Sequence, residues 1–208
     1  GDNLEGYVQA SMQSRDSTSF TLNFTDTHEQ QYVTFTAYSF SDGEHHVGFF
    51  DSPTDTSTVS ISEPGFEPNF ARVVTTPNLG SMNTSVNELS TGTDTVGWSQ
   101  GVAVENDVEG LLQGSLGVSQ WSSNIDGHAY NGSDTDVISL AYMDSAKTAL
   151  AGRIEADITG FTINGFDISY SVNNPTATGG DDYPVVTYLV ANTDSQPTAG
   201  FETTPTTT

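Results

Sequence analysis

The alternation of apolar and polar residues is clearest between residues 152 and 171. From 154 to 159, isoleucine and alanine alternate with acidic residues and threonine, which is the period-2 pattern of a strand with one buried face. Asn164-Gly165 separates this run from a second alternating run at 166–170, and that dipeptide favours the positive φ angles of a tight type I′ hairpin turn. The apolar run at 185–190 is typical of a central strand buried on both faces. We therefore expect the core to be built around this hairpin and this strand.

Shorter runs of strand character recur along the rest of the chain. They lie at residues 20–24, 32–40, 47–50, 59–62, 70–76, 97–104, 116–121 and 137–143. The long polar stretch 122–136 is expected to be a surface loop, and 81–95 a surface loop or an edge strand. We also expect one short helical turn, at 108–113. We therefore predict an all-β fold, an antiparallel β-sandwich or jelly roll of about eleven strands with little or no helix.

The two ends of the chain differ in composition from its middle. Residues 1–19 are polar with few apolar anchors, and residues 192–208 are rich in threonine and proline, as is typical of segments that form no core of their own. We therefore predict an N-terminal arm at 1–19, a single β-sandwich domain at 20–191 and a C-terminal tail at 192–208. Because each end still carries a few apolar side chains, we expect both ends to lie across a neighbouring subunit.

The charge of the chain restricts its partners. The sequence has 4 Lys+Arg against 27 Asp+Glu, a formal net charge of −23, and no cysteine. Nucleic-acid binding needs clustered Lys and Arg, and an anionic membrane repels such a chain, so neither is an expected partner. Molar salt shortens the Debye length to about 3 Å and screens the repulsion between carboxylates. We therefore expect a protein from a halophile, with an acidic surface protein of a mesophile as the alternative.

Other global features exclude further classes. Without cysteine the chain has neither disulfides nor thiolate chemistry. We find no signal peptide and no apolar run long enough for a membrane span, so membrane insertion is not expected. The chain also lacks the Gly-x-Ser-x-Gly elbow, the His-Glu-x-x-His motif, the Walker loop and the dinucleotide fingerprint. In a chain this acidic no glycosidase-like carboxylate pair can be singled out, and we expect no enzymatic activity.

Three motifs follow one another in an order that resembles a group of β-sandwich structural proteins of tailed viruses. Residues 64–74, PGFEPNFARVV, resemble the GF-x-P-x-x-V strand of that group, and residues 97–101, GWSQG, resemble the small-residue strand that follows it. Residues 160–168, GFTINGFDI, and 187–191, TYLVA, resemble its closing hairpin and last strand. The resemblance covers residues 64–192, with the two long polar loops and the acidic surface as departures.

This resemblance implies a role. Proteins of the group are β-sandwich components of heads, turrets, tail tips or fibres, with loops that bind glycans in the manner of H-type lectins. It implies a non-enzymatic virion protein on the particle exterior, a head decoration, turret or tail component. Its partners would be further copies in a cyclic homo-oligomer, other virion proteins and a glycan or protein of the host surface. The alternative is a carbohydrate-binding, lectin-like module of a cell-surface or secreted protein.

Loops rich in aspartate offer candidate ion ligands. The candidate residues are Asp126, Asp134, Asp136, Asp181 and Asp182. Carboxylate oxygens on such loops suit Ca²⁺, Mg²⁺ or Na⁺, although none of the loops has the EF-hand spacing. The alternative is ordinary Asx-turn chemistry without an ion. No other cofactor is expected. His45 and His46 lie beside acidic residues, but neighbours on a strand point to opposite faces, so a solvated hairpin tip is favoured over a zinc site.

The same region holds the candidate contacts for a glycan or the host. They are Tyr130, His128 and Asn131. An aromatic ring in a polar loop can stack on a sugar, and Trp98, Trp121 and Tyr142 could extend such a platform. For the two tryptophans we favour packing in the core or in an interface.

Overall fold

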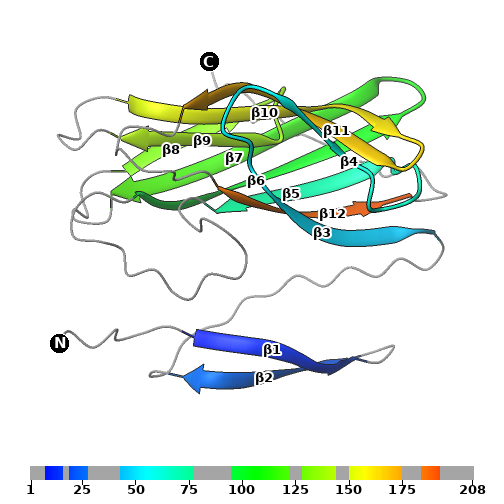
Figure 1. Ribbon diagram of the computed structural model, residues 1–208, viewed down its shortest axis with the longest axis vertical. Helices are drawn as coiled ribbons and strands as arrows, with labels where there is room; N and C mark the ends of the chain where they lie inside the picture. The colour runs from blue at the N-terminus through cyan, green and yellow to red at the C-terminus, as the bar shows by residue number, and fades with distance from the viewer. Residues whose placement is uncertain are drawn as a thin grey trace, which may run out of the picture. The chain divides into compact units, whose positions relative to one another are not determined.

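The computed structural model describes residues 8–15, 19–27, 43–76, 95–121, 128–143, 150–174 and 184–192. These residues form twelve β-strands and no helix (Figure 1). Within this part of the chain, no helix has the length and apolar character needed to cross a membrane. The chain divides into two compact units, residues 1–39 and 40–208.

The first unit contains a β-hairpin. β1 (Val8–Arg15) pairs antiparallel with β2 (Phe20–Thr27). The sequence predicts that strand pairing begins only at Phe20, and this is wrong. Residues 8–12 also alternate apolar and polar side chains, which is enough for a strand once a neighbour supplies the backbone hydrogen bonds. The predicted strand at 32–40 lies outside the described residues.

The second unit contains two antiparallel sheets, of which the larger has six strands in the order β3-β12-β5-β6-β7-β8. Their bounds are β3 (His45–Asp51), β12 (Val185–Ala191), β5 (Phe70–Thr76), β6 (Thr95–Asn106), β7 (Gly110–Trp121) and β8 (His128–Ser133). The apolar run predicted as a central strand is β12, which is paired on both sides, with β3 and with β5.

The smaller sheet has four strands in the order β4-β11-β10-β9. Their bounds are β4 (Thr58–Ile61), β11 (Gly165–Asn174), β10 (Leu150–Thr162) and β9 (Ile138–Met143). The two sheets pack face to face, and the side chains between them form one buried cluster that includes Ile154, Ile158, Phe166 and Tyr188. Figure 1 shows the two layers. The prediction of an all-β fold of packed antiparallel sheets is confirmed.

The hairpin predicted at 152–171 is formed by β10 and β11, but its turn differs from the prediction. Thr162 pairs with Gly165, so the two turn residues are Ile163 and Asn164 and Gly165 opens β11. The positive φ angles of described glycines lie at Gly43, Gly65 and Gly110, and Gly165 is not among them. A Cβ at Gly165 would instead meet the carbonyl of Ile61. Glycine is needed at 165 because another segment approaches closely, not because the turn requires a positive φ.

Two further local predictions are corrected. Of the predicted helical turn at 108–113, residues 110–113 belong to β7. Residues 107–109 form a tight turn between β6 and β7, in which Asn106 Oδ1 accepts hydrogen bonds from the backbone N–H groups of Val108 at 2.9 Å and Glu109 at 2.6 Å. The predicted loop at 122–136 contains β8, which pairs with β7 from Ser115 to Gln120. The residues of β8 are mostly polar and do not favour a strand by themselves. Its strand conformation therefore depends on its pairing with the backbone of β7.

Small residues let β9 lie close against β6 and β7. A Cβ at Gly101 would meet the carbonyl of Val137, and one at Gly117 would meet the carbonyl of Ser139. The Ser139 N–H donates a hydrogen bond to Ser99 Oγ at 3.0 Å, and Ser119 Oγ donates to the carbonyl of Ala141. The inner side of β6 and β7 is therefore partly lined by small polar residues, and backbone contact replaces side-chain packing there.

Candidate functional site

The outward side of the six-stranded sheet is mostly apolar. In β12, β5, β6 and β7 alternate central residues are buried between the sheets, in β3 they are half-buried, and the residues between them point away from the core. We call the central outward side chains of β3, β12, β5, β6 and β7 the outer face. It comprises Val47, Phe49, Arg72, Val74, Trp98, Gln100, Val102, Leu116, Val118, Thr187 and Leu189.

Strand register aligns these side chains in rows. One row crosses all six strands at Phe49, Thr187, Val74, Gln100, Leu116 and Gly132. Apolar side chains on this surface are well exposed: Val47 and Leu116 are each 70% exposed, Phe49 51% and Trp98 46%. The exposed side chains lie on one face of one sheet, and half-buried Thr187, Val74 and Gln100 connect them along the row from Phe49 to Leu116.

Carboxylates are scarce on this side of the sheet. The outer face has no Asp or Glu, and among the outward positions that the structure describes on these strands the one carboxylate is Asp51, at the end of β3. Its single cationic residue is Arg72, whose Nη2 donates a hydrogen bond of 2.7 Å to Gln100 Oε1. In a chain with 27 Asp+Glu, a surface of this size without carboxylates departs from the general composition.

The outward side of the four-stranded sheet has the opposite character. β10 and β11 carry acidic and hydroxyl side chains there, among them Glu155, Asp157, Asp167 and Ser171. Partial burial raises the pKa of Asp157 above its usual value, and the negative charge of nearby Asp136 raises it further. The sandwich therefore has one polar and one apolar outer surface.

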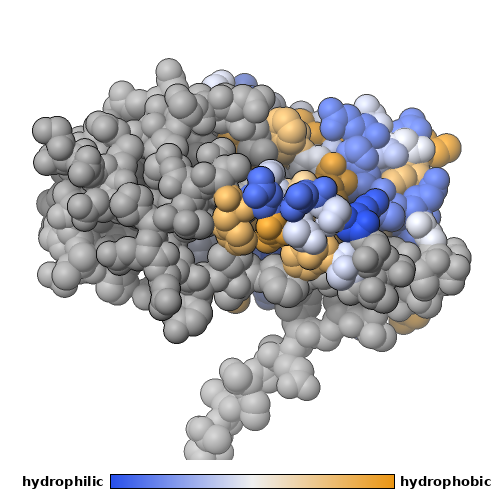
Figure 2. Space-filling model, turned by 90° about the horizontal axis from the view of Figure 1, so that it is seen from below, coloured by the Kyte–Doolittle hydropathy of each residue, from blue (hydrophilic) through white to orange (hydrophobic). Residues whose placement is uncertain are grey.

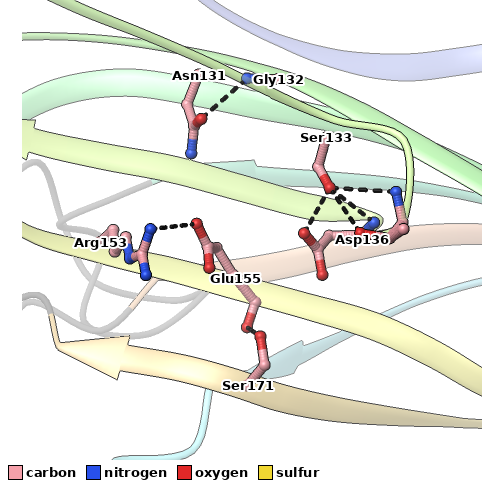
Figure 3. Close-up of polar contacts among 8 residues, drawn as sticks. Asn131, Gly132, Ser133, Asp136, Arg153, Glu155 and Ser171 are labelled. Carbon is pink, nitrogen blue, oxygen red and sulfur yellow. Dashed lines mark hydrogen bonds and ion pairs between the residues drawn. The ribbon is translucent and has the colours of Figure 1, made fainter.

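Local contacts on the polar side are typical of a surface in water. Arg153 forms an ion pair of 3.2 Å with Glu155, and Ser171 Oγ donates a 3.3 Å hydrogen bond to the Glu155 carbonyl (Figure 3). Elsewhere apolar residues also reach the surface: in Figure 2 hydrophobic groups lie directly beside strongly hydrophilic ones on the described part of the molecule. What distinguishes the outer face is its continuity and its lack of carboxylates.

The turn between β8 and β9 holds several residues singled out from the sequence. Ser133 Oγ donates a hydrogen bond of 2.5 Å to Asp136 Oδ2 and accepts one of 3.1 Å from the Asp136 N–H (Figure 3). The Ser133 oxygen thus caps the backbone of its own turn, as Ser turns do. Asn131 precedes this turn within β8, and its Oδ1 accepts a hydrogen bond of 3.0 Å from the N–H of Gly132.

The structure does not gather the predicted ion ligands that it describes. Asp134 is exposed, and Asp136 is turned toward Ser133. Within the described ranges no group of three or more His, Cys, Asp or Glu side chains is placed to hold a metal ion. Asp126, Asp181 and Asp182 lie outside these ranges, so an ion site that uses them stays a prediction.

The two neighbouring histidines begin β3 and point to opposite sides, as their strand position requires. The ring of His46 stacks on Tyr188 at a centroid distance of 5.9 Å, so it lies on the core side. His45 is exposed. The sequence expectation of a solvated hairpin tip therefore fits His45 and is wrong for His46.

The predicted glycan contacts belong to β8. His128 and Tyr130 pair with Gln120 and Val118 of β7, and their side chains lie outside the description. Asn131 is half-buried, and its Oδ1 accepts a hydrogen bond from the N–H of the next residue in β8. Trp98, one of the two tryptophans expected in a core or an interface, is on the outer face and not in the core.

Sequence reasoning did not single out Val47, Phe49 or Leu116. Alternation in their strands shows that two faces exist, yet both faces of these strands carry apolar residues. Strands that are covered on both sides show the same pattern, so the pattern alone could not identify these three residues as exposed.

Comparisons with protein families, with curated proteins and with solved structures find no match to this chain.

Proposed function

We propose that this chain is a non-enzymatic structural protein on the exterior of a tailed-virus particle, from a virus that infects a halophile. The observation that carries the proposal is the outer face, an exposed apolar surface on an otherwise strongly acidic chain. Contiguous apolar surface of this kind marks a site of contact with another molecule. A subunit of an assembly has such a surface on one side and a solvated surface on the other, which is the arrangement of the two sheets.

The motifs that resemble tailed-virus proteins support the same role. Residues 64–74 lead into β5, 97–101 lie in β6, and 160–168 span the β10–β11 turn. Residues 187–191 form most of β12. All of them are parts of the sandwich, so the resemblance concerns its framework and not the polar loops.

Immunogold labelling of purified virus particles tests this function. Antibodies against the chain should decorate the exterior of tailed particles whose genome encodes it, and mass spectrometry of those particles should detect the chain at a fixed ratio to the major capsid protein. Finding the chain only at the cell surface or in the culture medium, and absent from particles, would refute the proposal.

A lectin-like module of a secreted or cell-surface protein is the second candidate, and Trp98 favours it. Its ring is 46% exposed, and it pairs with Val118, which pairs with Tyr130. Exposed aromatic rings can stack on sugars. Saturable binding on a glycan array that Trp98→Ala abolishes, without any association with particles, would establish this candidate in place of the first. No binding by the wild type at any glycan would exclude it.

A further inference from the structure

We propose that the outer face is the contact between two copies of this chain, which pack through it as a two-fold symmetric dimer. This inference deepens the proposed structural role by naming the surface on which assembly begins. It rests on the distribution of charge, on the hydrogen bonding of Arg72 and on the area of the sheet.

Charge selects a second copy as the partner. Two chains with a net charge of −23 repel each other, and carboxylates brought together across an interface cost several kcal/mol. The outer face lacks Asp and Glu, so two copies can meet there without placing carboxylates opposite each other. A strongly basic partner would be attracted to the acidic surfaces instead, and a nucleic acid would find one arginine, Arg72.

Arg72 is suited to burial in such a contact. Its Nη2 already donates to Gln100 Oε1 of the same chain at 2.7 Å, so this one of its five N–H donors keeps a partner when the face is covered. Arginine and tryptophan are the residues most enriched among those that dominate binding energy at interfaces. Arg72 and Trp98 both lie on this face, with aliphatic side chains around them.

The geometry of the sheet permits a two-fold contact of adequate size. A two-fold axis between β5 and β6, the middle pair of the six strands, sets β3 of one copy over β8 of the other and β12 over β7. Six strands about 4.8 Å apart and about seven residues long at about 3.3 Å per residue give each face a projected area of roughly 650 Å². Two such faces bury roughly 1,300 Å², just above the lower limit of stable interfaces, about 1,200 Å².

Sedimentation equilibrium of the full chain in molar NaCl tests the dimer. We expect the wild type to be dimeric at tens of micromolar, and Leu116→Asp and Phe49→Asp each to weaken dimerisation about 30-fold or more. The matched controls are Val108→Asp and Ile163→Asp, which place the same charge on side chains that are 91% and 76% exposed in turns away from the outer face. We expect both controls to remain dimeric. If Leu116→Asp fails to fold by circular dichroism, Leu116→Ser takes its place.

Several results would overturn the inference. A wild type that stays monomeric, variants that dimerise as the wild type does, or controls that dissociate to the same extent would each do so. A monomer whose tryptophan fluorescence shifts to the blue on neutral phosphatidylcholine vesicles, with the shift lost in Leu116→Asp, would assign the face to lipid. Immunogold labelling of particles tests the proposed function independently of the dimer, because the chain can be present on particles and still fail to dimerise through this face.

Discussion

Gly117 and Gly101 are positions where a single methyl group decides whether the sheets can close. A Cβ at Gly117 would meet the backbone carbonyl of Ser139, and one at Gly101 that of Val137. Both obstacles are main-chain atoms, one in β9 and one in the residue just before it, and they cannot rotate away as a side chain can. The distance between the two sheets is therefore set by the absence of side chains at these positions.

We predict that Gly117→Ala lowers the free energy of unfolding by about 1–3 kcal/mol, because the methyl group forces β9 away from β7. Chemical denaturation in molar salt measures this. Gly160→Ala is the matched control, since a Cβ there meets nothing within 4 Å, and we expect its stability to equal or slightly exceed that of the wild type. Equal losses in both variants would show that backbone flexibility, not contact with Ser139, is responsible.

Tyr188 gives the protein a dependence on alkaline pH. Its ring is 2% exposed and its hydroxyl donates to Glu63 Oε2 at 3.2 Å. Burial raises the pKa of Tyr188 above its ordinary value of 10.0, and the charge of Glu63 raises it further. Burial also raises the pKa of Tyr170, against a smaller opposing effect of the Ser52 hydroxyl. Both phenols stay protonated in the folded state at pH values where the unfolded chain ionises.

We therefore predict that stability is lost as the pH rises above about 10, because the unfolded state then releases protons that the folded state retains. Tyr188→Phe keeps the ring and removes one titrating group, so it should reduce the slope of unfolding free energy against pH above this value. Urea denaturation between pH 8 and 11 measures the slope. An unchanged slope in Tyr188→Phe would contradict this assignment, and Tyr170→Phe tests the second phenol in the same way.

At the scale of elements, the β10–β11 hairpin is held by the segment that follows β4. The Gly65 N–H donates to the Asn164 carbonyl at 2.9 Å, and β4 pairs with β11 from Ile61 to Thr58. A Cβ at Gly165 would meet the Ile61 carbonyl and approach Pro64 Cδ at 3.3 Å. The turn is thus shaped by its neighbour as much as by its own residues.

We predict that Gly165→Val destabilises the fold by at least about 1 kcal/mol, because the larger side chain displaces β4 or the turn. The control is Ile163→Ser in the same turn, whose side chain is 76% exposed and whose loss should change stability by less than about 0.5 kcal/mol. Thermal and urea denaturation of both variants provide the comparison. Unchanged stability in Gly165→Val would mean that the Ile61 carbonyl does not lie close enough to Gly165 to exclude a side chain there.

At the scale of the whole molecule, the carboxylates should make stability depend on salt. With a net charge of −23, repulsion within the folded chain is strong in dilute salt and is screened in molar salt. We predict that the melting temperature falls when NaCl is lowered from molar to millimolar, as calorimetry at fixed pH can measure. A melting temperature that stays constant or rises when NaCl is lowered would remove the argument for a halophilic source.

The division into two units leads to a second prediction at this scale. The buried cluster between the two sheets consists, among the described residues, of side chains from Ile61 to Val190 and uses none from the β1–β2 hairpin. We therefore predict that a chain lacking residues 1–39 still folds, with a melting temperature within a few degrees of the full chain. Loss of the cooperative transition in the truncated chain would show that the sandwich requires the first unit.

The class of the fold and much of its framework could be predicted from the amino-acid sequence. Strand periodicity is a local property, so the positions of β10, β11 and β12 could be predicted from their own residues. The lack of long helical patterns in the sequence could be recognised in the same way. The β1–β2 pairing, the strand character of β8 and the reason for glycine at 165 could not, because each depends on the backbone of a segment elsewhere in the chain.

The outer face was decided by tertiary structure alone. Val47 and Phe49 come from β3, which is far in the sequence from β6 and β7, where Trp98 and Leu116 lie, and strand order and register bring them to one surface. Alternation shows that a strand has two faces but does not show which of them another layer covers. That depends on how far each sheet extends, and here the four-stranded layer covers one side of the six-stranded sheet and leaves its apolar outer side exposed.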